Sequence, residues 1–205
     1  MSCTWKVVFL GESSVGKSSV ITRYTQGKFL KNNATIGAAF SSRKIVIDSN
    51  HEVQLEIWDT AGQERYRSLT QMYYRNTDVA IIVFDLSLDI EESLKHVDSW
   101  IEELYKFTDE DSGNHLQIVV VGNKWDLLKE KKDVRIQEYI ESKGQDQCNL
   151  RYLEVSAKTG LNVTKLFEET VIELIPNDKF TLAIENEPET IPLNQEIINT
   201  NSCNC

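Results

Sequence analysis

The stretch "GESSVGKS" at residues 11–18 decides the fold, because it fits the pattern G-x-x-x-x-G-K-[ST]. It follows the apolar run "WKVVFL" (5–10), which predicts a buried strand, and it opens the helical pattern "GKSSVITRYTQG" (16–27). In that context, successive backbone N–H groups can wrap an anionic phosphate at the positive end of the helix. Lys17 would then reach the β- and γ-phosphates, and the Ser18 hydroxyl would coordinate Mg²⁺. The alternative is a glycine-containing turn with a surface lysine, but the strand before the motif and the helix after it argue against this.

Apolar runs and helical patterns alternate along the rest of the chain. The runs "DVAIIVFDL" (78–86) and "LQIVVVGNK" (116–124) are nearly continuous, as central parallel strands covered on both faces require. Further strands are expected at 43–48, 53–59 and 150–157, and further helices at 90–107, 134–144 and 162–176. The last helix has Asn162 as its expected cap and Pro176 as its stop. This order predicts an α/β fold with a mostly parallel sheet, in which ligands bind at the carboxyl ends of the strands.

Composition and charge exclude several classes of protein. The formal charge of −10 argues against a nucleic-acid-binding protein, which needs a basic face. No stretch approaches the roughly 20 apolar residues of a membrane span. The four cysteines (Cys3, Cys148, Cys203 and Cys205) have no framework spacing, so a reducing, cytoplasmic setting is expected.

The character of the chain changes after Pro176, and we therefore expect one domain at 1–176 and a disordered tail at 177–205. The tail has two prolines, little periodicity and many Asn, Glu and Thr residues. Its one lysine against one aspartate and four glutamates gives −4, which leaves −6 of the total −10 for the domain. Within the domain, the acidic segment "TDEDSGNH" (108–115) is expected to be solvated surface.

A second motif, "WDTAGQE" (58–64), also follows a predicted strand. Asp59 at the strand end can hold magnesium through water, as an acidic residue does in phosphoryl chemistry. Gly62 allows the backbone to approach a terminal phosphate, and Gln63 can orient an attacking water. Alone, this motif would be an ordinary turn; together with the phosphate loop it indicates hydrolysis of a nucleotide.

Two further motifs, "NKWD" (123–126) and "SAK" (156–158), follow the later strands. Asp126 can accept hydrogen bonds from both N–H groups on one edge of guanine, a donor pair that adenine lacks. The stem of Lys124 can lie over a ring face, and a backbone N–H of the second motif can support the base. Either motif alone is common in loops, but their order behind the phosphate loop favours a guanine-nucleotide site.

With these four motifs in order, residues 5–176 resemble the small GTPases of the Ras superfamily. The resemblance implies a small G domain of the P-loop NTPase class, with a six-stranded sheet flanked by about five helices. It implies a GTPase that binds GTP or GDP with Mg²⁺. It also implies that 32–40 and 60–75 are the two switch segments, with Thr35 as a second hydroxyl ligand of Mg²⁺ and Phe29 against the base.

The residues expected to act on this basis form three groups. The nucleotide-binding residues are Gly11, Ser13, Ser14, Val15, Gly16, Lys17, Ser18, Ser19, Phe29, Thr35, Gly62, Asn123, Lys124, Asp126, Ser156, Ala157 and Lys158. The metal ligands are Ser18, Thr35 and, through water, Asp59, and the catalytic residues are Lys17 and Gln63.

Within the superfamily, the chain is most similar to the Rab branch. The segments "IGAAF" (36–40), "WDTAGQERY" (58–66) and "SLTQMYYRN" (68–76) resemble Rab signatures, and Ala38-Ala39 resembles the early-endosomal group. This implies a switch in vesicle and endosomal trafficking, on the cytoplasmic face of membranes and cycling with the cytosol. The residues implied to bind effectors are Phe40, Trp58 and Tyr73.

Two features depart from the family's pattern. Trp125 replaces the small or aliphatic residue usual inside "NKxD", which would alter stacking beside the base. The segment "SSRK" (41–44) matches no subgroup.

The three residues implied to bind effectors, Phe40, Trp58 and Tyr73, could instead be core residues. This alternative is strongest for Trp58, which lies on a predicted strand.

The last residues, "NTNSCNC" (199–205), contain two cysteines. Three roles are open for them: metal ligands, a redox pair, or attachment points for another group. Two ligands are too few for a closed zinc site, and an acidic tail is a poor setting for a redox thiol. The Rab resemblance implies double geranylgeranylation of Cys203 and Cys205, with nothing after Cys205 to form a C-a-a-X box. Stable anchoring takes two signals, and a tail of charge −4 cannot supply a basic one, so both lipids are expected to be needed.

The resemblance also implies partners: an exchange factor, a GTPase-activating protein, a GDP-dissociation inhibitor or escort protein, and effectors on a monomeric G domain. No arginine lies between Arg23 and Arg43 to act in cis, so intrinsic hydrolysis is expected to be slow. The alternatives are a P-loop ATPase or small-molecule kinase, and a nucleotide-bound scaffold that does not hydrolyse.

Overall fold

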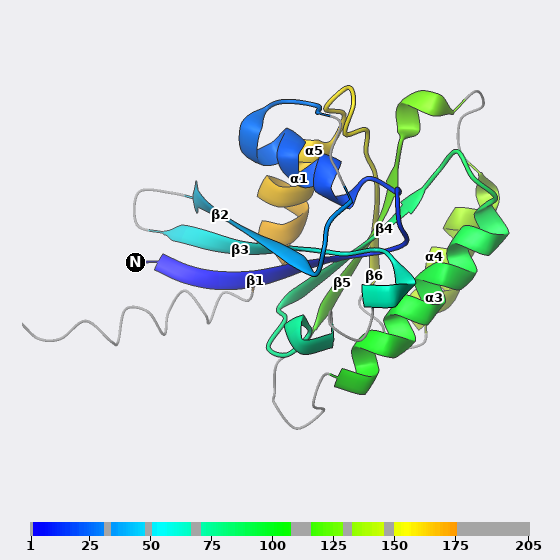
Figure 1. Cartoon of the computed structure of the whole chain (residues 1–205), viewed down its shortest axis with the longest axis horizontal. Helices are drawn as coiled ribbons and strands as arrows, with labels where there is room; N and C mark the ends of the chain where they lie inside the picture. Colours follow the sequence, from blue (N-terminus) through cyan, green and yellow to red (C-terminus); the bar gives the residue numbers. More distant parts are fainter. Residues whose placement is uncertain are drawn as a thin grey trace, which may run out of the picture.

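The computed structural model describes residues 2–30, 34–47, 51–66, 71–107, 116–128, 133–145 and 150–175. They form one six-stranded sheet with the order β2-β3-β1-β4-β5-β6 (Figure 1). Its strands are β1 (Ser2–Leu10), β2 (Ala38–Val46), β3 (Glu52–Thr60), β4 (Val79–Asp85), β5 (Gln117–Asn123) and β6 (Leu150–Glu154). Only β2 and β3 pair antiparallel; every other pair is parallel. The predicted α/β fold with a mostly parallel six-stranded sheet is therefore confirmed.

Four helices flank the sheet in the described residues, where about five were predicted. They are α1 (Lys17–Gln26), α3 (Ile90–Phe107), α4 (Val134–Gln145) and α5 (Val163–Lys165), which continues as a π-helix (Leu166–Val171) and a 3₁₀ turn (Ile172–Leu174). Short 3₁₀ turns cover Glu64–Tyr66, Gln71–Tyr73 and Trp125–Leu127. None of these helices has both the length and the apolar character of a membrane span.

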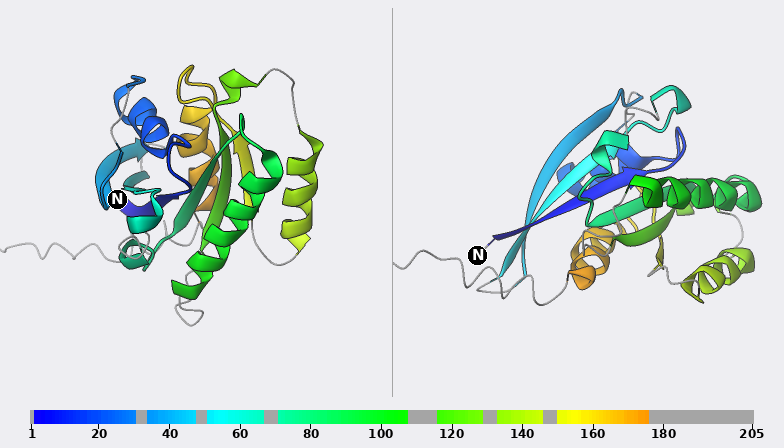
Figure 2. Two further views of the ribbon diagram at one scale, coloured as in Figure 1. Left: turned by 45° about the vertical axis from the view of Figure 1, so that its right-hand side comes forward. Right: turned by 90° about the horizontal axis from the view of Figure 1, so that it is seen from below.

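The helices cover both faces of the sheet (Figures 1 and 2). Side chains of α1 and α5 form one hydrophobic cluster with alternate residues of the strands, and side chains of α3 and α4 form the other. All seven residues of β4 are buried, and the first six alternate between the two clusters. The continuous apolar run thus reflects a central strand covered on both sides.

One helix start differs from the prediction. Asn162 precedes α5, but its side chain makes no capping hydrogen bond, because its backbone is left-handed (φ 54°). The Asn162 Nδ2 instead donates to the Glu154 carbonyl at 2.8 Å, which ties the helix start to the end of β6. Pro176, the acidic segment 108–115 and the tail 177–205 with both of its cysteines lie outside the described residues.

Candidate functional site

The phosphate loop joins β1 to α1 through backbone conformations that favour glycine. Gly11, Ser14 and Gly16 all have positive φ, at 133°, 65° and 100°. A Cβ on Gly11 would lie 2.1 Å from the Val83 carbonyl oxygen, and one on Gly16 would lie 2.4 Å from the Asn123 Nδ2. Both glycines of the motif are therefore required by φ and by space.

Lys17 is held over this loop by the loop's own backbone. Its Nζ donates to the carbonyls of Gly11, at 2.7 Å, and Glu12, at 2.9 Å. Burial lowers the pKa of Lys17 to about 8, against the opposing effects of the Asp59 and Glu12 carboxylates. The ammonium group lies on the floor of the site with hydrogen bonds that phosphate oxygens can replace.

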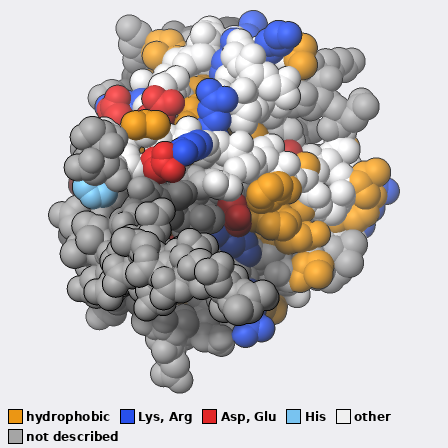
Figure 3. Space-filling view, turned by 90° about the vertical axis from the view of Figure 1, so that its left-hand side faces the viewer, with side chains coloured by type: hydrophobic (Ala, Val, Ile, Leu, Met, Phe, Trp, Pro, Cys, Tyr) orange, Lys and Arg blue, Asp and Glu red, His pale blue; other side chains and the backbone are white. Residues whose placement is uncertain are grey.

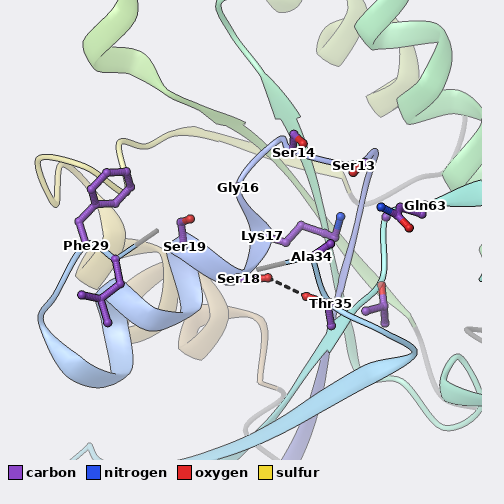
Figure 4. A pocket seen from close by; sticks show the side chains of 13 residues that line it. Ser13, Ser14, Gly16, Lys17, Ser18, Ser19, Phe29, Ala34, Thr35 and Gln63 are labelled. Carbon is purple, nitrogen blue, oxygen red and sulfur yellow. Dashed lines mark hydrogen bonds between the residues drawn. The ribbon is translucent and has the colours of Figure 1, made fainter. Parts of the chain in front are cut away.

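Three oxygen-bearing side chains from three separate segments meet beside Lys17. The Ser18 Oγ lies 3.0 Å from the Thr35 Oγ1 (Figure 4). The Thr35 Oγ1 donates to the Asp59 Oδ2 at 3.3 Å. Burial raises the pKa of Asp59, while hydrogen bonds from Ser18 and Thr35 and the charge of Lys17 oppose the rise. The Asp59 Oδ1 is buried without a hydrogen-bond partner. Hard oxygen donors with one unsatisfied carboxylate oxygen fit Mg²⁺, directly or through water.

Gly62 closes the site from the side of β3. A Cβ at this position would lie 2.3 Å from the Lys17 Nζ and 2.5 Å from the Glu12 carbonyl oxygen, so only glycine fits. Gln63 follows at the edge of the same cavity, and its Oε1 accepts a hydrogen bond from the Arg65 Nε at 2.8 Å.

These groups border a cavity of about 320 Å³, here called the phosphate-side cavity, with Phe29 toward one end and Gln63 toward the other in Figure 4. Its lining residues are Ser13, Ser14, Gly16, Lys17, Ser18, Ser19, Phe29, Leu30, Ala34, Thr35, Thr60, Gly62 and Gln63. Leu30, Ala34 and Thr60 were not predicted. Each is a sequence neighbour of a predicted residue, and Ala34 and Thr60 also lie within the predicted switch segments.

A second cavity of about 340 Å³, the base-side cavity, adjoins the first. The two share Ser14, Gly16, Ser19 and Phe29. The base-side cavity continues to Asn123, Lys124, Asp126, Leu127, Ala157 and Lys158, of which only Leu127 was not predicted. The two motifs after β5 and β6 thus lie together, next to the phosphate loop.

Asn123 connects the three loops of the site. Its Nδ2 donates to the Val15 carbonyl at 2.8 Å, and its Oδ1 accepts from the Ala157 N–H at 3.2 Å. Val15 contributes its backbone here, because its side chain packs in the core. Lys124 places its Nζ 2.5 Å from the Asp85 Oδ2.

Asp126 is oriented by the segment 156–158. The Ser156 hydroxyl donates to the Asp126 Oδ1 at 2.6 Å, and the Lys158 Nζ lies 3.7 Å from the Asp126 Oδ2. Trp125 packs against the hydrophobic cluster under α3 and lines neither cavity. This differs from the expectation that its side chain would lie where it alters stacking beside the base.

The three aromatic residues predicted for effectors form one contiguous group across β2, β3 and the turn at Gln71–Tyr73. The ring centroids of Phe40 and Trp58 are 5.2 Å apart, and those of Trp58 and Tyr73 are 5.1 Å apart. Phe40 is 53% exposed, whereas Trp58 is half-buried against the core, with its indole N–H buried and without a partner. Figure 3 shows hydrophobic side chains gathered on part of the surface seen from the left of Figure 1.

Comparison with known proteins gives concordant matches. The sequence model of the Ras family matches residues 6–176. The GTP-binding protein ypt5 of Schizosaccharomyces pombe is 43% identical over 180 residues, which cover 87% of this chain and 81% of the relative. The GTP-binding protein YPT53 of Saccharomyces cerevisiae is 39% identical over 217 aligned residues, which cover 98% of this chain and 95% of the relative.

Proposed function

This chain belongs to the Ras family, as a Rab-type small GTPase of vesicle trafficking, and we propose that its two joined cavities hold one molecule of GTP or GDP. The phosphates lie at residues 11–18 and the guanine at Asp126. The observation that carries this proposal is the continuity of the cavities, which share four residues between a phosphate loop and a carboxylate suited to guanine.

The phosphate end would bind through main-chain N–H groups and through Lys17. When a phosphate enters, its oxygens replace the Gly11 and Glu12 carbonyls as partners of the Lys17 Nζ. A nearby dianion also favours the protonated lysine, so binding offsets the effect of burial on its pKa.

Ser18, Thr35 and Asp59 would hold Mg²⁺, which when bound neutralises charge on the β- and γ-phosphates. The Thr35 hydroxyl is already 3.0 Å from the Ser18 hydroxyl, so Thr35 of the first switch segment lies against the loop. Gly62 leaves room for its N–H to reach the terminal phosphate. When GTP is hydrolysed, both segments lose that partner and are released.

Hydrolysis would need the Gln63 amide to orient the attacking water. Its oxygen accepts a hydrogen bond from Arg65, which leaves one lone pair of that oxygen to accept from the water. With no arginine between Arg23 and Arg43 to stabilise the transition state, we propose slow turnover that an activating protein accelerates. The kinase, ATPase and scaffold alternatives are not favoured.

We further propose that Cys203 and Cys205 carry two prenyl groups that anchor the chain to the cytoplasmic face of endosomal membranes. Both prenyl groups are needed, because the acidic tail has no basic patch that could attract anionic lipid as a second anchoring signal. Phe40, Trp58 and Tyr73 would bind effectors, and an exchange factor and a carrier that shields the lipids would complete the cycle.

The test is to purify the protein without added nucleotide, denature it and identify what is released. One equivalent of guanine nucleotide, mostly GDP, is the expected result. Adenine nucleotide would overturn the role of Asp126. An empty protein that fails to bind added GDP would overturn the assignment of the two cavities.

A further inference from the structure

Arg23 lines neither cavity, but its side chain donates hydrogen bonds to the backbone of two segments that lead to them. From α1 its Nε donates to the Ala157 carbonyl at 2.8 Å, and its Nη2 donates to the Lys158 carbonyl at 2.5 Å. Its Nη1 donates to the Gly27 carbonyl at 2.8 Å. One guanidinium thus joins three carbonyls from two segments far apart in sequence, at Gly27 and at 157–158.

The first of these bonds orients a peptide that borders the base-side cavity. In a trans peptide the C=O and the following N–H point in opposite directions. Because the Ala157 carbonyl faces Arg23, the Lys158 N–H faces away from it. Both residues line the base-side cavity, which makes this N–H available to a ligand there. The Ala157 N–H is held by the Asn123 Oδ1, so the peptides on both sides of Ala157 are fixed.

The second bond leads to the carboxylate of the guanine site. With the Lys158 carbonyl held by Arg23, the following N–H, that of Thr159, points to the Ser156 Oγ at 3.1 Å. The Ser156 hydroxyl in turn donates to the Asp126 Oδ1 at 2.6 Å. Arg23 therefore supports the orientation of Asp126 through a continuous series of hydrogen bonds.

The third bond fixes the segment that leads to Phe29. Gly27 ends α1 in a left-handed conformation (φ 68°), and its N–H bonds to the Arg23 carbonyl at 3.0 Å. Its own carbonyl is held by the Arg23 side chain. Phe29, two residues further on, borders both cavities.

We propose that Arg23 is a positioning residue for guanine: it holds the 156–158 segment and the approach to Phe29 in the geometry that favours this base over other purines. This rests on the proposed binding of GDP in the joined cavities. An arginine suits the position because its planar fork donates in several fixed directions, whereas the single ammonium of a lysine cannot serve three spread carbonyls equally. Hydrogen bonds from a charged donor are also stronger than neutral ones.

The test compares two ligands by equilibrium competition: GDP and the diphosphate of purine riboside, which lacks both the 6-oxo and the 2-amino group. Arg23→Ala is expected to weaken GDP by about tenfold. It should change the affinity for purine riboside diphosphate by less than about threefold, since that ligand keeps only the ring contact with Phe29 and lacks the groups that Asp126 and the 156–158 segment recognise. Arg23→Lys, which keeps the charge, should give an intermediate loss for GDP, and it serves alone if Arg23→Ala does not fold.

The matched control is Arg151→Ala, which removes an exposed arginine bound to Glu173 on the surface and should leave both affinities unchanged. A merely structural Arg23 would weaken both ligands equally or lower only the melting temperature, and either outcome overturns the inference. If the unmodified chain binds no GDP, the proposed function itself is overturned. If it binds GDP normally and the variants keep the same preference for GDP over purine riboside diphosphate, only the inference about Arg23 is overturned.

Discussion

Lys17 is the only lysine or arginine among the described residues whose side chain is buried. Its lowered pKa, about 8, therefore predicts how nucleotide binding depends on pH. The ligand binds the protonated lysine, and above pH 8 the free protein loses that proton. The affinity for GDP should thus fall above pH 8, by about tenfold at pH 9 relative to pH 7. Equilibrium titration with a fluorescent GDP analogue between pH 7 and 9 measures this.

The control for this prediction is Lys17→Arg, because an arginine does not lose its proton in this range. The affinity of this variant for GDP, whatever its absolute value, should not change between pH 7 and 9. A wild-type affinity that stays constant to pH 9 would mean that the ammonium keeps its ordinary pKa of 10.5.

Gln63 carries a separate prediction, because its proposed role is in the chemical step and not in binding. Gln63→Leu should leave GTP affinity within about twofold and reduce single-turnover hydrolysis on the order of a hundredfold, since the attacking water loses its orientation. Arg65→Ala is the companion variant, which frees the Gln63 amide without removing it. Hydrolysis that is unchanged in Gln63→Leu would exclude this residue from positioning the water.

At the scale of elements, the sequence predicts well where a single physical requirement dominates. The apolar runs at 78–86 and 116–124 became β4 and β5, because a strand covered on both faces must be apolar throughout. The stripe on α3, including Trp100 and Leu104, is buried as the helical period requires. The four motifs begin at or directly after the carboxyl ends of strands, so their convergence follows from the parallel topology.

Prediction from the sequence is wrong or incomplete where strand pairing or the path of a loop determines the structure. β2 was expected from Arg43, but it begins at Ala38, because pairing with β3 extends the strand over residues of low strand propensity. Lining residues such as Ala34 and Leu127, and the bonds of Arg23, depend on how loops approach each other and leave no local pattern. Asn162 has the residue type of a cap but the wrong backbone conformation.

Leu104 tests the packing of α3 on the sheet. Its side chain is fully buried in the cluster under this helix, so Leu104→Ala should lower the free energy of unfolding by about 2–5 kcal/mol. Urea denaturation of the GDP-bound protein measures the loss. Glu102→Ala, on the exposed side of the same helix, should stay within about 0.5 kcal/mol of the wild type, and equal losses in both variants would contradict the assigned face.

At the scale of the whole molecule, the base-side cavity and the last described residues lie at opposite ends of α5. Both cavities lie at the carboxyl ends of the strands, and the segment 156–160 that borders one of them precedes the first turn of α5. α5 therefore runs away from the base-side cavity toward residue 175 (Figure 1). Treated as a flexible coil, the tail of 177–205 spans roughly 30 Å, enough to separate an anchored terminus from the nucleotide.

This separation permits a test of the proposed anchor that leaves the GTPase intact. One prenyl chain binds a membrane only marginally, and the tail's net charge of −4 offers no second attraction, so loss of either thiol should release the protein. Cys203→Ser and Cys205→Ser, expressed in cells, should each move most of the protein from the membrane pellet to the soluble fraction while GDP binding stays normal. Cys3→Ser, which changes a thiol on β1, is the control and should stay with the membranes. Full pelleting of the Cys203→Ser protein would show that one lipid suffices and that another part of the chain supplies the second signal.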